Sequence, residues 1–205
     1  MILLPLLLAL APANDAPVAT RGLYLQLIRQ ARADGRPRAA LAYLDDFDRR
    51  YRGDRDALVL RINSLLDLQD LDAAEAAAAQ LPADDSAAAI RGHLLAARGR
   101  WADALPFYQA AIHASPADPL LRNALGYAQL RAGGPTRAIE TLRAAQDLAP
   151  ADRTIRNNLL LALALAGQRA EVEAALRQIR DAREQDTLRR QLAAEAVRLS
   201  TAKGS

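Results

Sequence analysis

Apolar positions recur along most of this chain with the period of an amphipathic α-helix. Residues 101–115 illustrate the pattern. Their apolar side chains return at intervals of three and four residues: Leu105, Tyr108, Ala111 and Ile112. Gly99 precedes this segment and Pro116 follows it, and both residue types commonly end a helix. Short helical segments separated by such breaks predict a chain built from paired helices.

The breaks and several small residues recur at an interval of 34 residues. The turn glycines with this spacing are Gly99, Gly133 and Gly167. The other matches at 34 residues are Gly92 with Gly126, Ala104 with Ala138, Ala111 with Ala145, Pro116 with Pro150, and Arg122-Asn123 with Arg156-Asn157. Because several independent pairs share one interval, the chain contains a repeated unit.

Weaker copies of the unit extend toward the amino terminus. Gly35 lies 64 residues before Gly99, an interval that divides into 34 plus 30 with Gln69 at the intermediate turn. We therefore predict five helical pairs, which begin near Arg21, Arg55, Asp85, Pro119 and Arg153. A further amphipathic helix over residues 185–201 is expected to cap the last pair, and residues 202–205 form a tail.

The repeated unit resembles the tetratricopeptide repeat (TPR). That family places a small residue in the first helix, then an alanine, an aromatic residue, a second alanine and a proline in and after the second. The third unit matches all five positions, with Gly92, Ala104, Tyr108, Ala111 and Pro116. The resemblance implies an all-α fold in which residues 21–184 form a right-handed superhelical solenoid of about five hairpins, closed by the capping helix.

In this family the first helices of the pairs line the concave side. The resemblance therefore implies a peptide-binding groove lined by residues from each unit: Arg29, Asn63, His93, Asn123, Tyr127, Asn157 and Leu161. Asn123 and Asn157 occupy equivalent places in adjacent repeats, and such a ladder can hold the amide groups of an extended peptide, since each side chain donates and accepts. The alternative is that asparagine simply tolerates an exposed helical position.

The first residues of the chain predict export. Residues 1–11 are uncharged and apolar, of the length of a signal-peptide core and too short to span a bilayer. The small-x-small pattern Ala11-Pro12-Ala13 follows. We predict a signal peptide over residues 1–13, a linker over 14–20, and a periplasmic or envelope location. No Lys or Arg precedes the apolar core, so either the signal is weak or the true start lies upstream. The alternative to export is a buried amino-terminal helix of a cytoplasmic protein.

Charge and composition narrow the function classes. The 205 residues include 27 basic and 24 acidic side chains, for a net charge of +3, and the two signs are interspersed. This pattern predicts a solvated surface, and no nucleic-acid partner, because nucleic-acid binders cluster their basic residues. Arg122 and Arg156 stand where the family usually has a bulky aromatic residue. They either pack their stems along a neighbouring helix or offer cations to an acidic partner.

No motif for catalysis, metal binding or cofactor binding is found. The absence of cysteine excludes disulfides, thiolate metal sites and cysteine nucleophiles. His93 and His113 have no second histidine or acid at metal-motif spacing, and no serine lies in a Gly-x-Ser-x-Gly setting. We therefore predict a protein that is not an enzyme, with no catalytic residue, metal or cofactor.

Residues 152–168 are similar to the last repeats of TadD, the TPR protein family of tight-adherence (Flp) pilus assembly systems. That resemblance implies a non-catalytic scaffold that binds protein or peptide segments and assists assembly of a pilus or secretion machine. Members commonly carry a lipidated cysteine after the signal peptide, which this chain lacks, so we expect membrane association only indirectly or through an uncleaved amino-terminal segment. The alternatives are a cytoplasmic adaptor or chaperone for an unrelated partner, and a regulatory subunit of an enzyme.

Overall fold

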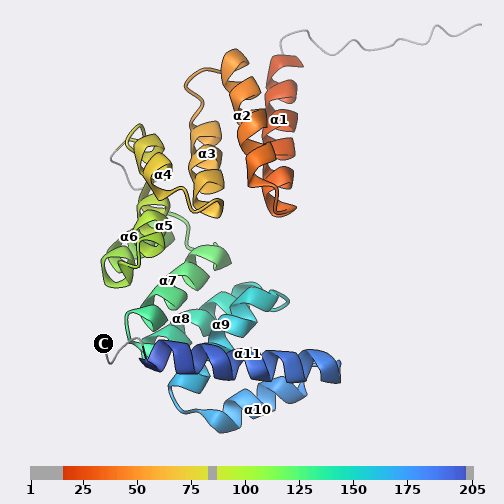
Figure 1. Ribbon diagram of the computed structural model, residues 1–205, viewed down its shortest axis with the longest axis vertical. Coiled ribbons are helices and arrows are strands. Elements are labelled where there is room, and N and C mark those ends of the chain that lie inside the picture. Colours follow the sequence, from red (N-terminus) through yellow and green to blue (C-terminus); the bar gives the residue numbers. More distant parts are fainter. Residues whose placement is uncertain (1–15, 83–86, 202–205) are drawn as a thin grey trace, which may run out of the picture. The chain divides into compact units, whose positions relative to one another are not determined.

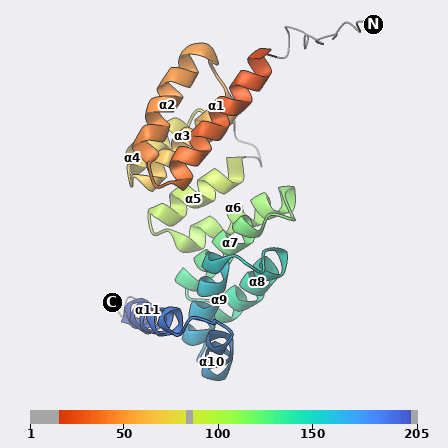
Figure 2. The same cartoon turned by 90° about the vertical axis from the view of Figure 1, so that its right-hand side faces the viewer.

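The computed structural model describes residues 16–82 and 87–201, and these residues form helices and connecting turns, with no β-strand in either range (Figures 1 and 2). The chain divides into two compact units, Met1–Leu81 and Pro82–Ser205. The predicted signal peptide, residues 1–13, lies outside the described residues. None of the described helices has both the length and the hydrophobicity that crossing a bilayer requires.

The first unit contains two helical pairs, α1 (Ala16–Ala33) with α2 (Pro37–Arg50) and α3 (Arg55–Asp67) with α4 (Leu71–Ala78). α1 packs against α2 and α3. The hydrophobic core among these three helices includes Leu25, Ile28, Leu44, Phe47 and Leu60. α1 begins at Ala16, so the prediction of a linker as far as residue 20 is wrong. The segment contains no residue after Pro17 that would interrupt a helix.

The second unit contains three helical pairs and a final single helix. The pairs are α5 (Ala88–Ala97) with α6 (Trp101–Ala114), α7 (Pro119–Arg131) with α8 (Pro135–Leu148), and α9 (Arg153–Leu165) with α10 (Arg169–Arg177). The long helix α11 (Ala182–Thr201) packs on α9 and lies in front of it in Figure 1. The five pairs and the capping helix confirm the predicted all-α architecture. α11 starts three residues before the predicted 185 because the Asp181 carboxylate accepts a hydrogen bond from the backbone N–H of Arg183.

The turn inside each pair has the same geometry. At Gly99, φ is +75°, its N–H donates to the carbonyl of Ala96, and the next N–H donates to the carbonyl of Leu95. This is the Schellman arrangement, which requires a left-handed residue just after the helix. Gln69 takes that place in the turn between α3 and α4 with φ +60°, as the 34-plus-30 division predicted.

Aspartates begin several of the first helices. The carboxylate of Asp118 accepts from the N–H of Leu120 at 2.8 Å, and that of Asp152 accepts from the N–H of Thr154 at 2.8 Å. Asp54 caps α3 in the same way, through the N–H of Ala57 at 3.0 Å. A capping aspartate satisfies N–H groups that have no partner within the helix, so the start of each of these helices is set locally.

The two helices of a pair approach closely at a glycine. A Cβ atom at Gly92 would lie 2.8 Å from Cε1 of Tyr108, and one at Gly126 would lie 2.6 Å from Cγ of Leu142. Tyr108 and Leu142 are themselves buried in the second helices. The absence of a side chain at these two positions therefore allows α5 to seat on α6 and α7 on α8.

We expect Gly126→Ala to destabilise the protein by about 1–3 kcal/mol, because the added methyl group overpacks the contact with Leu142. The matched control is Gly22→Ala on α1, where no atom lies within 4 Å of the new Cβ. That substitution should stabilise its helix by about 0.5–1 kcal/mol. Thermal unfolding followed by circular dichroism measures both, and equal effects of the two substitutions would contradict the close approach.

A partly buried ion pair holds α1 to the start of α3. Arg21 Nε lies 2.6 Å from Oδ2 of Asp54, whose side chain is only 10 % exposed, and Arg21 also pairs with the more exposed Asp56. Burial alone would raise the pKa of Asp54. Hydrogen bonds from Arg21 and from the N–H of Ala57 outweigh it and lower the pKa below its ordinary value.

A lowered carboxylate pKa stabilises the fold above the unfolded-state pKa, and this contribution is lost as the pH falls through the folded-state pKa. We therefore expect the contact between α1 and α3 to weaken below about pH 4. Asp54→Asn should cost about 1 kcal/mol at neutral pH and reduce this acid sensitivity. Hydrogen exchange of the α1 and α3 amides as a function of pH tests this. Asp56→Asn is the control, and unchanged acid sensitivity in Asp54→Asn would contradict the assignment.

Candidate functional site

One face of α7 carries four side chains of different chemistry. Leu120, Asn123, Tyr127 and Arg131 are spaced by three, four and four residues and therefore share a face, which we call the α7 stripe. Leu120 is 61 % exposed and the other three side chains are half-buried. The Asp118 cap and the turn at Gly133 hold the two ends of α7, so the stripe is carried on a rigid element.

A hydrogen bond joins the α7 stripe to α9. The Asn158 side-chain N–H donates to Oδ1 of Asn123 at 2.9 Å. The sequence predicted Asn157 as the second member of an asparagine ladder, and the structure places its neighbour there. Asn157 Oδ1 instead accepts from the guanidinium of Arg156 at 3.3 Å. Asn123 and Asn157 are equivalent in repeat position, 34 residues apart. Because a helix turns by about 100° per residue, Asn157 and Asn158 face different directions, and it is Asn158 that reaches Asn123.

Arg131 lies against two aromatic rings. Its Cζ is 4.4 Å from the ring centroid of Trp101, the first residue of α6, and 5.8 Å from that of Tyr127. Its Nη1 donates to the Tyr127 hydroxyl at 3.2 Å, and the two rings meet edge to face at 5.7 Å. Sequence reasoning missed Trp101, Arg131 and Asn158. The spacing of four between Tyr127 and Arg131 was the available signal.

The end of α11 comes close to the same cluster. Arg198 interacts electrostatically with Tyr127, although its main partner is Glu195, at 2.6 Å, which is the chief cause of its raised pKa. Tyr127 also packs against the buried cluster that includes Leu192 and Leu199 of α11. The hydroxyl of Tyr127 accepts from Arg131, and the ring of Tyr127 packs against the core that α11 helps to form.

His93 turns toward its own hairpin. Its Nδ1 lies 3.0 Å from the hydroxyl of Tyr108 on α6, and the two rings meet edge to face at 5.3 Å. Burial raises the pKa of Tyr108, so the hydroxyl keeps its proton. The structure therefore places His93 in the packing between α5 and α6, half-buried, and does not bring it to the α7 stripe.

Leu161 does not line a binding surface. It is 5 % exposed and belongs to the same buried cluster as Leu188, Leu192 and Leu199 of α11. The prediction of Leu161 as a groove residue is wrong because the capping helix packs on α9 and covers this position. Of the remaining predicted groove residues, Arg29 is exposed on α1 and Asn63 is half-buried on α3, both in the first unit.

A polar pocket of about 380 Å³ lies between α9 and α11. It contains Asn157, and its charged lining includes Arg153, Arg156 and Glu184. Both arginines pair with Glu184, and their hydrogen bonds lower its pKa, so it stays ionised. Arg156 thus fastens the capping helix, while the equivalent Arg122 donates to the carbonyl of Pro116.

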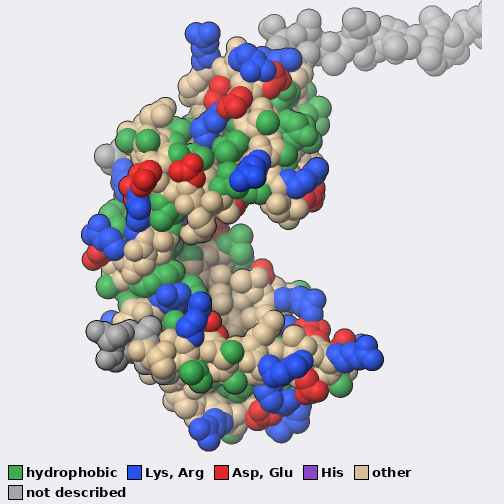
Figure 3. All heavy atoms as spheres, in the orientation of Figure 1, with side chains coloured by type: hydrophobic (Ala, Val, Ile, Leu, Met, Phe, Trp, Pro, Cys, Tyr) green, Lys and Arg blue, Asp and Glu red, His purple; other side chains and the backbone are tan. Residues whose placement is uncertain are grey.

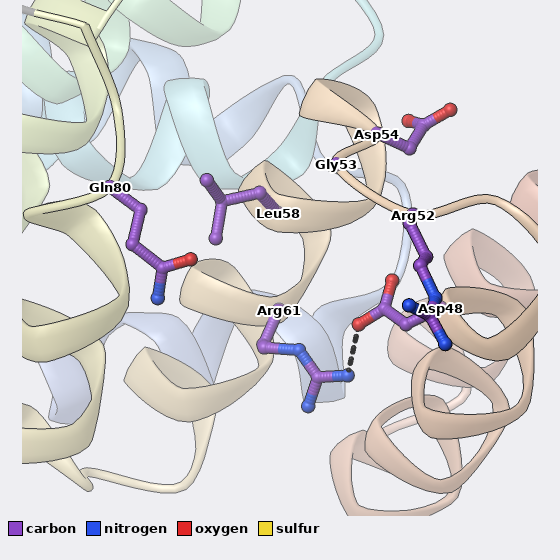
Figure 4. Close-up of a pocket in the computed structure, with 7 residues that line it drawn as sticks. All are labelled: Asp48, Arg52, Gly53, Asp54, Leu58, Arg61 and Gln80. Carbon is purple, nitrogen blue, oxygen red and sulfur yellow. Dashed lines mark hydrogen bonds and ion pairs between the residues drawn. The ribbon is translucent and has the colours of Figure 1, made fainter.

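The first unit has a pocket of its own, of about 430 Å³, shown in Figure 4. Arg61 lies across from Asp48, to which it pairs at 2.9 Å, and Leu58 and Gln80 lie on the opposite side. Asp54, also in the lining, is held by Arg21. These carboxylates already have cationic partners, and within residues 16–82 and 87–201 no cluster of His, Asp and Glu side chains is arranged to hold a metal ion.

Charges of both signs are interspersed over the visible surface of each unit in Figure 3, as the sequence pattern predicted. Hydrophobic side chains (green in Figure 3) lie among the charged ones on the visible face of each unit. The candidate site is defined by the specific arrangement of side chains on the α7 stripe.

Comparison with known proteins identifies the fold. Residues 95–157 match the tetratricopeptide repeat family, and no curated protein matches the chain. Among solved structures, the thermophilic TPR protein TTC0263 from Thermus thermophilus is 21 % identical with a TM-score of 0.70, over 86 % of this chain and 98 % of that one. MamA from Desulfovibrio magneticus RS-1, residues 41 to the end, is 21 % identical with a TM-score of 0.52, over 90 % and 97 %.

YrrB, described as a TPR protein with an unusual peptide-binding site, is 16 % identical with a TM-score of 0.53, over 85 % of this chain and 90 % of that one. Identities at this level establish the fold alone. The five helical pairs, the left-handed turns and the family match over the central repeats agree with this fold. Residues 95–157 are tetratricopeptide repeats by family match, and the described residues as a whole have the tetratricopeptide-type fold of paired helices.

Proposed function

We propose that this protein is a non-catalytic scaffold that binds an extended segment of another protein along the first helices of its second unit. The α7 stripe is the observation that carries the proposal. On one face of α7 it offers an exposed leucine, an amide and a phenol, and Asn158 of α9 adds a second amide. These groups suit an apolar side chain and the polar backbone of a peptide.

The amide pair keeps hydrogen-bonding capacity after its own bond is made. Asn123 uses its oxygen and Asn158 uses an N–H, which leaves the amide nitrogen of Asn123 and the oxygen of Asn158 available to a ligand. A peptide backbone needs one donor and one acceptor for each residue. The peptide-binding site named for YrrB, which shares the fold, also supports a peptide ligand.

We further propose that the partner belongs to a pilus or secretion assembly in the bacterial envelope. Two features of the sequence support this: the similarity of residues 152–168 to TadD repeats and the apolar stretch over residues 1–11. A cytoplasmic adaptor with an unrelated partner is the alternative, and localisation separates the two.

Cell fractionation and a pull-down with the carboxyl-terminally tagged native protein test the envelope proposal. We expect recovery from the periplasm or envelope, a mature amino terminus near Asn14, and co-purification of secretin or pilus-assembly components. Recovery from the cytoplasm with Met1 intact and a different partner would overturn this part and leave the scaffold proposal standing.

Leu120→Ala tests the binding face. Because Leu120 is exposed in the free protein, its loss should leave thermal stability unchanged but weaken binding of the recovered partner about three- to tenfold, as expected for losing about 1 kcal/mol of apolar contact. Leu148→Ala on α8 is the matched control, since Leu148 is 46 % exposed on a second helix. Calorimetric titration of both variants gives the comparison. Equal affinities would show that the partner does not bind along α7.

A further inference from the structure

Charge is distributed unevenly between the two kinds of helix in the second unit. The first helices α5 (Ala88–Ala97), α7 (Pro119–Arg131) and α9 (Arg153–Leu165) contain arginine but no aspartate or glutamate. Their arginines are Arg91, Arg122, Arg131, Arg153 and Arg156. The second helices α6, α8 and α10 each contain at least one acid. Apart from the capping aspartates Asp118 and Asp152 at the starts of α7 and α9, the first helices of this unit thus carry only positive charge.

Arg131 stands out among these arginines. Arg153 and Arg156 pair with Glu184, and Arg91 and Arg122 donate to the carbonyls of Pro82 and Pro116. Arg131 lies against aromatic rings instead, and no acidic side chain of the described residues pairs with it. Its half-buried guanidinium is held over Trp101 and makes one hydrogen bond, to Tyr127. A guanidinium has five N–H donors, so most of this group's capacity is left unused in a partly desolvated position.

Arg131 and Leu120 lie at the two ends of the α7 stripe, and the distance between them sets the length of peptide that can contact both. The two residues are eleven positions apart on α7, which corresponds to about 16 Å at 1.5 Å per residue. An extended peptide covers that length with about five residues at about 3.3 Å each. The amide pair and Tyr127 lie between these two ends.

We propose that the α7 stripe selects an acidic segment, in which a carboxylate of the partner pairs with Arg131 and an apolar side chain about five residues away packs on Leu120. This rests on the proposed function, because it names the chemistry of the segment bound there. The stacked guanidinium presents its remaining N–H groups in a plane, which matches the two oxygens of a carboxylate. The charge of the segment complements first helices that hold no acid.

Selection of a random peptide library on the full-length protein tests the proposal without knowledge of the natural partner. We expect enrichment of Asp or Glu at a spacing of four to six residues from Leu, Ile or Phe. A synthetic peptide of the selected sequence should bind about tenfold more weakly to Arg131→Gln, the size expected for losing a charge-assisted hydrogen bond. Arg137→Gln, which removes one exposed arginine from α8, should bind as the wild type does.

Further measurements distinguish specific recognition by the Arg131 guanidinium from an effect of the substitution on folding and from nonspecific attraction between opposite charges. Arg131→Lys keeps the charge but loses the planar fork, so it should bind with intermediate affinity while its circular dichroism and thermal unfolding match those of the wild type. Added salt should weaken binding to the wild type more than to Arg131→Gln. A single-stranded oligonucleotide should not compete with the peptide, and effective competition would overturn the assignment to an acidic peptide.

The outcomes distinguish this inference from the proposed function. If peptides selected on the wild type are enriched in Asp or Glu and bind Arg131→Gln more weakly, the result supports both the acidic-segment inference and the proposed scaffold function. Selected peptides that depend on Leu120 but carry no excess of acids, or that bind Arg131→Gln normally, overturn the inference and leave a peptide scaffold in place. A library that yields no peptide sensitive to either residue overturns the inference and the proposed function together.

Discussion

The close approach of α5 to α6 and of α7 to α8 is the constraint on which the second unit depends. Gly92 faces Tyr108 and Gly126 faces Leu142 at distances that leave no room for a methyl group. Since helices pack as near-rigid bodies, a larger residue at either position would displace the whole first helix. The orientation of the α7 stripe is thus set by the Gly126 contact, which lies about 100° around the same helix from the stripe.

Local interactions at the helix ends complete this arrangement. The aspartate caps fix where α7 and α9 begin, and the left-handed turns fix where they end. These interactions involve residues near in sequence, while the core between helices joins neighbouring pairs. A repeat protein is stabilised in this way by units that contact mainly their neighbours, and side chains on successive first helices come into register without long-range pairing.

Much of the fold could be predicted from the sequence because it is encoded by local signals that recur. The 34-residue interval located the turns, including the one where Gln69 replaces glycine, and the small residues marked the helix crossings. The site was predicted less well. Repeat position identified Asn123 and Tyr127, but it could not distinguish Asn157 from Asn158 or detect that α11 buries Leu161, because both depend on how neighbouring helices pack. The contact between Trp101 and Arg131 was not predicted, because it joins two different repeats.

The hydrogen bond between Asn158 and Asn123 has a consequence for the orientation of any peptide bound there. Because the donor comes from α9 and the acceptor from α7, Asn123 keeps both of its side-chain N–H groups, and Asn158 keeps its carbonyl oxygen and one N–H. A ligand residue that bonds to the free oxygen of Asn158 must turn its N–H toward α9. Its carbonyl can then accept from Asn123 on α7, so this pairing favours one of the two directions of a ligand chain.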